Sequence, residues 1–296
     1  MLLNRARKNL DLKHLNRYNL KFFFNDEGFA LRPLLNYKNF STIECGDFIT
    51  KLVENKSELK KAQALRYSVF YKENKAQPTF KKKLMRLDYD RLDKFSDHLI
   101  VIDKNNKCIK KKIIGTYRLI RGDIASYFGG FYTSSEFNLT NILNSYNDKQ
   151  ILELGRSCVH KDYRNGTTIN LLWKAIAQYV KLYDIKTLLG CASFPGTDVK
   201  KFSKELSYLR YNFSLPDEIS VQSLDNNIYP VYVGNNIYKN DLRIFAKLPP
   251  LIKGYLRVGG KVSDSCFVDY DFNTIDLCVV VQTDNIDKKY RNKFLN

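Results

Sequence analysis

A strand, a tight turn and a long helix follow one another without a break between residues 151 and 183. Residues 151–159 are rich in apolar side chains, as in a buried strand, and Gly166 lies in the turn after them. A helix over residues 168–183 is predicted because its apolar side chains recur every three or four positions. This order favours an α/β arrangement in which the helix covers a face of a sheet. Its inward-facing residues would be Leu171, Leu172, Ala175, Ile176 and Tyr179.

The turn between this strand and this helix is typical of an anion site. A helix that begins directly after a glycine-containing turn directs backbone N–H groups and the positive end of its dipole toward one point. A phosphate or pyrophosphate group fits such a point. Spacing alone favours an ordinary connection between a strand and a helix, so the anion site is a hypothesis at this stage.

The pattern of the whole chain predicts a single α/β (α+β) domain in which helices flank one mixed, twisted sheet. Alternation and short apolar runs indicate the strands, and apolar spacing of three or four indicates the helices. Ser57 is a candidate N-cap of the first helix. A polar turn over residues 104–107 joins two strands into a hairpin, and residues 211–241 form a long connection. The expected strands are 48–53, 98–103, 113–120, 151–159, 187–193 and 275–281, and the expected helices are 57–73, 168–183, 198–209 and 251–258.

Residues 1–45 are basic and irregular and form an extension, which leaves residues 46–290 for the folded domain. Leu3, Ala6 and Leu10 fall on one side of a helical projection whose other side is basic. A basic amphipathic helix of this kind can lie on an anionic bilayer. The alternative is an arm that packs on its own domain.

The charge balance limits the class of partner. The chain carries 49 Lys and Arg against 31 Asp and Glu, a formal net charge of +18 over 296 residues. Nucleic acid, an anionic membrane surface, and an acidic protein or phosphorylated substrate would each be attracted by that charge. A solvated surface is the alternative that needs no partner. Since 44% of the residues are hydrophobic, the composition excludes a disordered chain.

Several other classes are excluded by what the sequence lacks. No stretch comes near the roughly 18 to 20 apolar residues of a membrane span, and no apolar segment follows the N-terminal residues as in a secretory signal. A folded cytoplasmic protein is therefore expected. The six cysteines and three histidines contain no C-x-x-C pair and no zinc-like spacing, so we predict no metal site.

Glu153 is a carboxylate inside an apolar strand segment. Such a residue either pairs with a basic neighbour, such as Arg156, or serves as a general base in a partly buried position. The pattern alone favours the salt bridge.

Short motifs along the chain resemble those of the ornithine–acyl carrier protein N-acyltransferases, a branch of the GNAT superfamily related to the acyl-homoserine lactone synthases. They follow the family's order over roughly residues 50–282, and their number makes the resemblance specific. The matching motifs include Arg66-Tyr-Ser-Val-Phe70, Asp88-Tyr-Asp-Arg-Leu-Asp93, Gly115-Thr-Tyr-Arg-Leu119, Glu153-Leu-Gly-Arg-Ser-Cys-Val-His160, Tyr163-Arg-Asn-Gly166, Gly190-Cys-Ala-Ser-Phe-Pro-Gly-Thr197, Leu248-Pro-Pro-Leu-Ile-Lys-Gly-Tyr-Leu-Arg257 and Asp271-Phe-Asn-Thr274.

The resemblance implies an enzyme that moves a 3-hydroxyacyl chain from acyl carrier protein to the α-amine of L-ornithine. The product would be lyso-ornithine lipid, made in the first step of ornithine lipid biosynthesis. The donor would be the 4′-phosphopantetheine arm of the acidic carrier protein, with no tightly bound cofactor. Compared with the superfamily pattern Gln/Arg-x-x-Gly-x-Gly/Ala, the glycine comes one place early, which agrees with a carrier protein as donor. By likeness to GNAT enzymes, the arm would be held by Arg164, Asn165, Gly166 and Thr167.

The resemblance also implies an acceptor site in which Glu153 is the general base for attack of the amine on the thioester. An α-amine with a pKa of about 7.7 to 8 is partly neutral near neutral pH, whereas a side-chain amine near 10.4 stays protonated. Carboxylates that hold the δ-ammonium would therefore direct acylation to the α-nitrogen. Each candidate also has a structural alternative, as a loop or cap residue, an ion pair or part of the core. The candidates are Asp93, Asp271, Asn273, Asp276, Arg66, Arg118 and Arg156 for the amino acid, and Phe131, Tyr132 and Phe137 for an acyl tunnel.

Other functions stay open at this point. Another amino-acid acceptor, or an acyl-homoserine lactone synthase that uses S-adenosylmethionine, lies within the same class of enzyme. A basic nucleic-acid-binding protein is the alternative from another class, but the basic residues form no known recognition motif, so we expect no nucleic-acid partner. The expected location is the cytoplasm, with peripheral contact to the inner face of the membrane. The basic clusters at residues 81–83 and 110–112 would serve either that surface or the acidic carrier protein.

Overall fold

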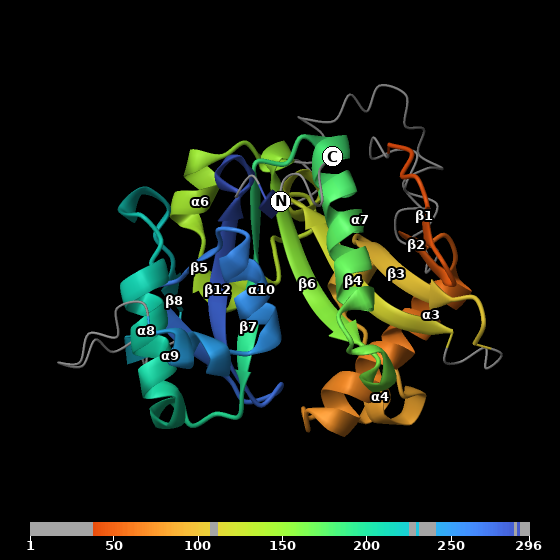
Figure 1. The fold of residues 1–296 in the computed structure, drawn as a ribbon, viewed down its shortest axis with the longest axis horizontal. Helices are drawn as coiled ribbons and strands as arrows, with labels where there is room; N and C mark the ends of the chain where they lie inside the picture. Colours follow the sequence, from red (N-terminus) through yellow and green to blue (C-terminus); the bar gives the residue numbers. More distant parts are fainter. Residues whose placement is uncertain (1–37, 107–111, 225–228, 231–240, 287–288, 291–296) are drawn as a thin grey trace.

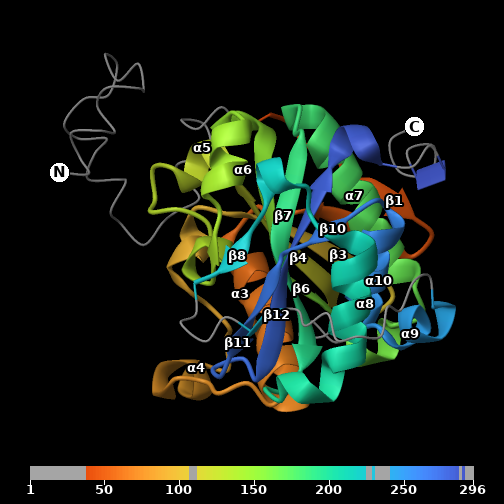
Figure 2. The same ribbon diagram turned by 90° about the vertical axis from the view of Figure 1, so that its left-hand side faces the viewer.

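One large mixed sheet forms the centre of the structure (Figures 1 and 2). The computed structural model describes residues 38–106, 112–224, 229–230, 241–286 and 289–290. The strands lie in the order β1-β2-β3-β4-β6-β7-β12-β11-β9, and β10 also pairs with β12. They are β1 Ile43–Cys45, β2 Phe48–Leu52, β3 Asp97–Asp103, β4 Ile113–Arg121, β6 Ile151–Val159, β7 Thr187–Pro195, β9 Tyr229–Pro230, β10 Lys261–Val262, β11 Ser265–Asp269 and β12 Thr274–Gln282.

Helices cover both faces of this sheet because the buried side chains of successive strand residues point to opposite faces. Leu99 and Val101 of β3 belong to the hydrophobic cluster that contains α7, α8 and α10, whereas Ile100 packs with α3 on the other face. The segment with α5 and α6 also lies on the α3 face. The helices are α3 Lys56–Tyr67, α4 Phe80–Met85, α5 Gly122–Ala125, α6 Thr140–Ser145, α7 Thr167–Tyr183, α8 Ser203–Phe213, α9 Leu242–Lys247 and α10 Pro250–Arg257.

The two middle strands of the sheet separate halfway along their length. Strands β6 and β7 run parallel, but their pairing covers only Ile151 to Glu153 of β6. Beyond that point β6 stays paired with β4, and β7 stays paired with β12. Gly190 of β7 lies at the separation, and a Cβ there would come within 2.2 Å of the Leu154 carbonyl oxygen. The separation opens space between the two strands on the α10 side of the sheet.

A β-bulge changes the direction of the β6 side chains just after the separation. Gly155 pairs with Arg118 and Cys158 pairs with Thr116, so Arg156 and Ser157 together face Tyr117. Arg156 has a φ of +50°, which is uncommon for a residue with a side chain. Bulges of this kind reorient side chains and are frequent beside active sites.

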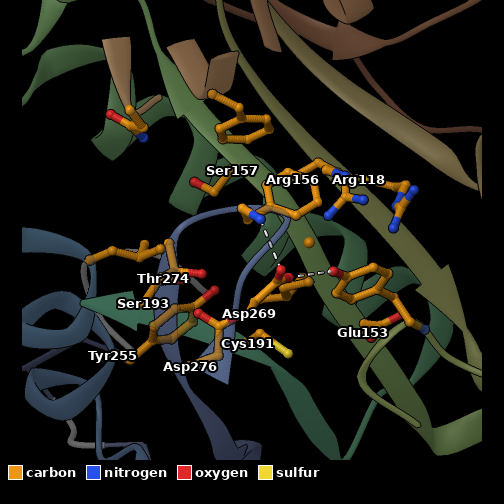
Figure 3. Close-up of a pocket in the computed structure, with 17 residues that line it drawn as sticks. Arg118, Glu153, Arg156, Ser157, Cys191, Ser193, Tyr255, Asp269, Thr274 and Asp276 are labelled. Atoms are coloured by element: carbon orange, nitrogen blue, oxygen red, sulfur yellow. Dashed lines mark hydrogen bonds between the residues drawn. The ribbon is translucent and has the colours of Figure 1, made fainter. Parts of the chain in front are cut away.

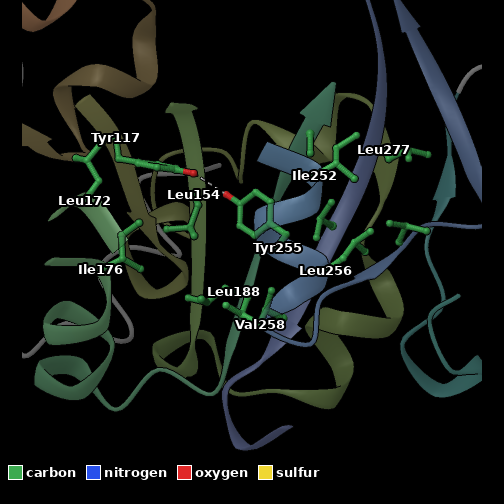
Figure 4. Packing of buried hydrophobic residues seen from close by; sticks show 14 of the residues in the cluster. Tyr117, Leu154, Leu172, Ile176, Leu188, Ile252, Tyr255, Leu256, Val258 and Leu277 are labelled. Carbon is green, nitrogen blue, oxygen red and sulfur yellow. Dashed lines mark hydrogen bonds between the residues drawn. The ribbon is translucent and has the colours of Figure 1, made fainter. Parts of the chain in front are cut away.

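Helix α10 is tied to the sheet through a pair of buried tyrosines. The hydroxyl groups of Tyr117 on β4 and Tyr255 on α10 are 3.0 Å apart (Figure 4). Ile252 and Leu256 of the same helix pack in the core beside them. The hydrogen bond satisfies two hydroxyl groups that burial would otherwise leave without a partner. The arrangement fixes α10 over the open end of β6 and β7.

The structure confirms the predicted fold class, a mixed sheet flanked by helices. Each expected strand occurs within one or two residues of its predicted bounds, and so do the helices α7 and α10. The hairpin of β3 and β4 also forms, although residues 107–111 at its turn lie outside the described part of the chain. Periodicity was sufficient for these elements because their apolar faces are continuous.

Several local predictions were wrong. Asn55, not Ser57, caps α3, since its side chain accepts a hydrogen bond from the Glu58 backbone N–H. The helix does continue to Glu73, but its last part, Ser68–Glu73, is π-helical. The helix expected over 198–209 begins as the 3₁₀ turn Val199–Phe202 and runs on as α8 to Phe213.

The structure also contains short strands that the sequence did not predict. The long connection over 211–241 contains β8 Gln222–Ser223, which pairs with β5 Phe137–Asn138 in a small second sheet. The large sheet includes β1 from Ile43, and the division of the chain at residue 46 stays a prediction. The amphipathic helix expected near the N-terminus falls within residues 1–37, outside the described residues. No helix in the described part of the chain is long and apolar enough to cross a bilayer.

Candidate active site

A pocket of about 220 Å³ occupies the space where β6 and β7 separate (Figure 3). Strand β6 contributes residues 153–157, β7 contributes Cys191 and Ser193, and α10 contributes Leu251 and Tyr255. In Figure 3, Arg118 and Arg156 lie along one side of the cavity and Asp276 and Cys191 along the other. The remaining lining residues are Phe70, Asn74, Tyr132, Asp269, Phe272 and Thr274.

Glu153 is held in the pocket wall by the start of a 3₁₀ turn. The side chain is 2% exposed. Its Oε2 atom accepts a hydrogen bond from the Tyr132 backbone N–H at 2.9 Å, and Oε1 accepts from the Thr133 backbone N–H at 2.6 Å and from the Thr133 hydroxyl. A carboxylate oxygen accepts about two hydrogen bonds, so Oε2 retains one free lone pair. The salt bridge to Arg156 that the sequence pattern favoured is absent among the described residues.

The three candidate arginines instead form a buried network with aspartates from one segment. Arg66 pairs with Asp88 at 2.9 Å and with Asp93 at 2.5 Å. Arg118 pairs with Asp90 at 2.7 Å and with Asp93 at 3.1 Å. Burial alone would raise the pKa of Asp93, but the charges of Arg66, His98 and Arg118 hold it well below its usual range. The predicted substrate residue Asp93 is therefore fully engaged with arginines.

Arg156 is the member of this network that reaches the pocket most openly. Its side chain is 9% exposed, against 1% for the other two arginines. It contacts Asp88 at 3.4 Å and Asp90 at 3.1 Å. Its guanidinium also lies over the rings of Tyr132 at 4.5 Å and Phe272 at 4.6 Å. Such stacking orients the planar group. In the described part of the chain its ion pairs use Nε and Nη2, and none uses Nη1.

Three buried carboxylates meet at the opposite side, where Asp269 and Asp276 line the pocket and Glu136 does not. Glu136, Asp269 and Asp276 each offer an oxygen within 4.8 Å of the others. Burial and the neighbouring carboxylates raise the pKa of Asp276 to about 6 and that of Glu136 well above its ordinary value. The Cys191 thiol donates a hydrogen bond to Glu136 at 3.1 Å. Burial also raises the pKa of this thiol far above its usual range, which disfavours a thiolate nucleophile.

A longer groove of about 690 Å³ adjoins the pocket. It runs along the end of β6 and past the start of α7, and its residues Phe70, Asn74, Ser157 and Leu251 line the pocket as well. The two cavities therefore lie side by side, with these four residues between them.

The predicted anion-binding turn lies at one wall of this groove. Gly166 has a φ of +95° and precedes the first turn of α7. The Asn165 side chain accepts a hydrogen bond from the Thr167 backbone N–H at 3.1 Å. Arg164 pairs with Glu73 at 2.6 Å and, with Gly166, lines the groove. The turn and the start of α7 occur where the sequence predicted them, directly after β6.

Comparisons with known proteins identify the family of the chain. Residues 65–174 match the family model described as an acetyltransferase (GNAT) domain. The L-ornithine N(alpha)-acyltransferase of Rhizobium meliloti is 37% identical over 246 residues, which are 83% of this chain and 83% of the relative. The enzyme of the same name from Rhodobacter capsulatus is 34% identical over 81% of this chain and 92% of its own length. The chain belongs to the L-ornithine N(alpha)-acyltransferase family.

The solved structures that match this acyltransferase share little sequence with it. The AHL synthase LasI is 11% identical, with a TM-score of 0.40 over 83% of this chain and 94% of that chain. FeeM, an N-acyl amino acid synthase from uncultured soil microbes, is 8% identical, with a TM-score of 0.41 over 87% of this chain and 97% of that chain.

Of the remaining candidate residues, some line the pocket and others lie outside it. Asp276 and Tyr132 line the pocket. Asp271 is exposed, and Asn273, with a φ of +54°, lies in the turn between β11 and β12. Phe131 and Phe137 line neither the pocket nor the groove, because they pack in the hydrophobic cluster on the α3 face.

The sequence pattern did not reveal four acidic residues that shape this site. Asp88 and Asp90 neutralise the arginines, and Glu136 and Asp269 join Asp276. Asp276 was a candidate only through the resemblance to the family's motifs. Glu136 and Asp269 lie at the ends of short elements, where acidic residues are common, so no local signal distinguished them.

Proposed function

We propose that this acyltransferase transfers a 3-hydroxyacyl group from acyl carrier protein to the α-amine of L-ornithine and so makes lyso-ornithine lipid, in the first step of ornithine lipid synthesis. The names of the relatives support the acceptor. The observation that carries the reaction is the junction of groove and pocket at Ser157, where β6 and β7 separate. An acyl donor in the groove and an amine in the pocket would meet at that junction.

The groove would hold the 4′-phosphopantetheine arm of the carrier protein, which is part of the substrate. Backbone N–H groups at the start of α7 would face the arm, and Gly166 keeps the approach free of a side chain. Arg164 at the groove wall would add a positive charge. The formal charge of +18 would also attract an acidic carrier protein from a distance.

The pocket would hold the amino acid with its α-amine near Glu153. Arg156 would bind the α-carboxylate through the edge of its stacked guanidinium. The free lone pair of Glu153 Oε2 would accept the proton of the attacking amine. The nitrogen then forms the amide bond to the thioester carbon, the carbon–sulfur bond breaks, and the sulfur leaves as a thiol after it receives one proton. Proton loss from nitrogen and proton gain at sulfur balance.

Expression of the chain in a bacterial host without aminolipids tests this function. We expect a new lipid whose mass corresponds to ornithine joined to one 3-hydroxyacyl chain, and its absence from cells that express the Glu153→Gln variant at an equal level. If the new lipid contained another amino acid, that amino acid and not ornithine would be the acceptor. No new lipid, with folded protein present, would contradict the proposal.

A further inference from the structure

We propose that Glu136, Asp269 and Asp276, here called the acid triad, form a subsite that binds the side-chain ammonium group of the acceptor. The inference rests on the proposed function for the reaction at the adjacent α-amine. It adds a physical basis for the choice of a basic amino acid with a short side chain. The triad would select the acceptor, whereas Glu153 would act on it.

The position of the triad is unusual for a chain with this charge. The three side chains are between 3% and 8% exposed, although buried carboxylates normally pair with a cation. In the described part of the chain, no ion pair joins any of them to a lysine or arginine. They come from three separate segments, the end of a 3₁₀ turn, the end of β11 and the start of β12. Their convergence therefore needs the folded chain.

One carboxylate oxygen of the triad is also left without a partner. Asp276 Oδ1 is buried and has no hydrogen-bond partner among the residues that the structure describes. Asp276 lines the pocket, so a ligand there can reach it. Leaving a buried acceptor unsatisfied costs free energy, which a bound donor would recover. An ammonium group offers three donors and one positive charge, and the triad offers three acceptors that lack a counter-charge.

A single side chain relates the triad to the proposed carboxylate site. The ring of Tyr132 lies under the Arg156 guanidinium at 4.5 Å, and its hydroxyl is 3.5 Å from Asp269. One tyrosine ring thus spans the distance between the Arg156 guanidinium and the acid triad. A short aliphatic chain between an α-carboxylate and an ammonium group would bridge a similar interval.

Protons compete with the ammonium group for the triad. Since burial raises the pKa of Asp276 to about 6, the triad binds protons more readily as the pH falls toward that value. A protonated triad lacks the charge that attracts a cation. Ornithine affinity should therefore decrease as the pH falls from 8 to 6, while the affinity for an amino acid without a side-chain ammonium should change little.

Isothermal titration of the full chain with L-ornithine and L-norvaline tests the inference, because norvaline has the same carbon skeleton without the δ-amine. We expect ornithine to bind about 100-fold more tightly than norvaline. In Glu136→Gln and Asp276→Asn, we expect this ratio to fall to about tenfold or less, with norvaline binding retained. The control is Asp217→Asn, an exposed carboxylate outside the pocket that should keep the wild-type ratio.

The outcomes separate the inference from the proposed function. Equal affinity of the wild type for ornithine and norvaline would overturn the inference, whatever the enzyme turns over. If the variants lost affinity for ornithine and norvaline equally, the triad would have only a structural role. That result would also overturn the inference. Ornithine binding that requires magnesium and disappears with a chelator would identify the triad as a metal site and overturn it too, since three carboxylates also suit a hard cation. Selective ornithine binding without acylation would contradict only the proposed function.

A different observation supports a second proposal, that helix α4 docks on an anionic lipid bilayer. Three large apolar side chains of this six-residue helix are exposed: Phe80 by 80%, Leu84 by 73% and Met85 by 53%. Lys82 points the other way, where its amine contacts the Tyr71 hydroxyl at 2.9 Å. The helix is therefore anchored by one side and presents its apolar side outward.

The surroundings of α4 favour a lipid surface as its partner. Lys81, Lys83 and Arg86 are exposed beside the apolar side chains, and cations flanking an apolar face are typical of helices that lie in an anionic interface. The helix is close to the pocket, since the Lys82 amine lies 6.0 Å from the Phe272 ring in the pocket wall. An amphiphilic product could then pass from the pocket to the membrane.

Vesicle sedimentation tests this docking surface. We expect the full chain to bind vesicles with about 30% phosphatidylglycerol at least about tenfold more tightly than neutral vesicles, because Lys81, Lys83 and Arg86 are attracted to an anionic surface. Phe80→Ser combined with Leu84→Ser should lose most of this binding, and the exposed Leu242→Ser on α9 is the matched control. Equal binding of the α4 variant and the control would overturn the proposal. So would a loss of acyl carrier protein use by the α4 variant without vesicles, which would assign α4 to the carrier protein.

Discussion

Thr133 donates both its backbone N–H and its hydroxyl to the same carboxylate oxygen of Glu153. The main chain at the start of a 3₁₀ turn thus fixes the orientation of the proposed base, and the second oxygen is left with capacity to accept a proton. A base fixed in this way needs little reorganisation when the amine attacks.

Glu153→Gln should lower kcat by about 10²- to 10⁴-fold, because the amide cannot take the proton of the amine. The KM for ornithine should change little. Steady-state rates with 3-hydroxyacyl carrier protein would measure this, with Glu218→Gln, an exposed site, as the control for loss of one carboxylate. Wild-type kcat in a folded Glu153→Gln enzyme would remove Glu153 from the mechanism.

Thr133→Val should reduce kcat by about tenfold. The substitution removes one of the three hydrogen-bond donors to Glu153, so the base is held less firmly in position. The same substitution should have no further effect on kcat in the Glu153→Gln background. A double-mutant cycle measures this coupling. Additive losses in the cycle would show that Thr133 acts on the rate by another route.

Arg156→Lys should raise the KM for ornithine by about tenfold or more and leave the KM for the acyl donor nearly unchanged, because lysine lacks the planar, stacked edge that binds a carboxylate. Arg164→Lys provides the opposite comparison, since Arg164 lines only the groove. It should raise the KM for the acyl donor alone. If both variants altered the same KM, the assignment of pocket and groove to separate substrates would be wrong.

Asp276→Asn should stabilise the enzyme at pH 7.5 while it weakens ornithine binding. The folded state holds a proton on Asp276 up to a pKa of about 6, compared with an ordinary value of 3.8. Between these values the folded state binds more protons than the unfolded state, so this group lowers the free energy of unfolding as the pH rises. The loss is complete above about pH 6 and amounts to about 3 kcal/mol.

Thermal unfolding at several pH values measures this effect. The Tm of Asp276→Asn should exceed the wild-type Tm by roughly 5 °C at pH 7.5, and the difference should shrink as the pH falls toward 4. A lower Tm than wild type at pH 7.5 would mean that the charged Asp276 carboxylate stabilises the folded state, contrary to the raised pKa of this group.

Much of the fold was accessible from the sequence because its elements have continuous apolar faces. The strand containing Glu153 and the helix after Gly166 were predicted almost to the residue. The bulge at Arg156 was not, since it results from how β6 pairs with β4 rather than from a local pattern. Its positive φ would have drawn attention only if glycine had occupied the position.

The candidate site was less accessible because its charged groups meet over long sequence separations. Arg66 contacts Asp93, which is 27 positions away, and Asp90 contacts Arg156 at a separation of 66. Composition indicates that buried arginines need carboxylates, but not which ones. Asp276 was a candidate through the resemblance to the family's motifs, whereas its partners Glu136 and Asp269 were given no role.

Mass spectrometry of the product made by the purified enzyme is the most direct test of acyl transfer to the α-amine of ornithine. The substrates are 3-hydroxyacyl carrier protein and L-ornithine with an isotopic label on the δ-nitrogen. We predict one product in which fragmentation finds the acyl chain on the unlabelled α-nitrogen and the label in a free amine. An acyl chain on the labelled nitrogen, or release of the free acid without any ornithine product, would contradict this mechanism.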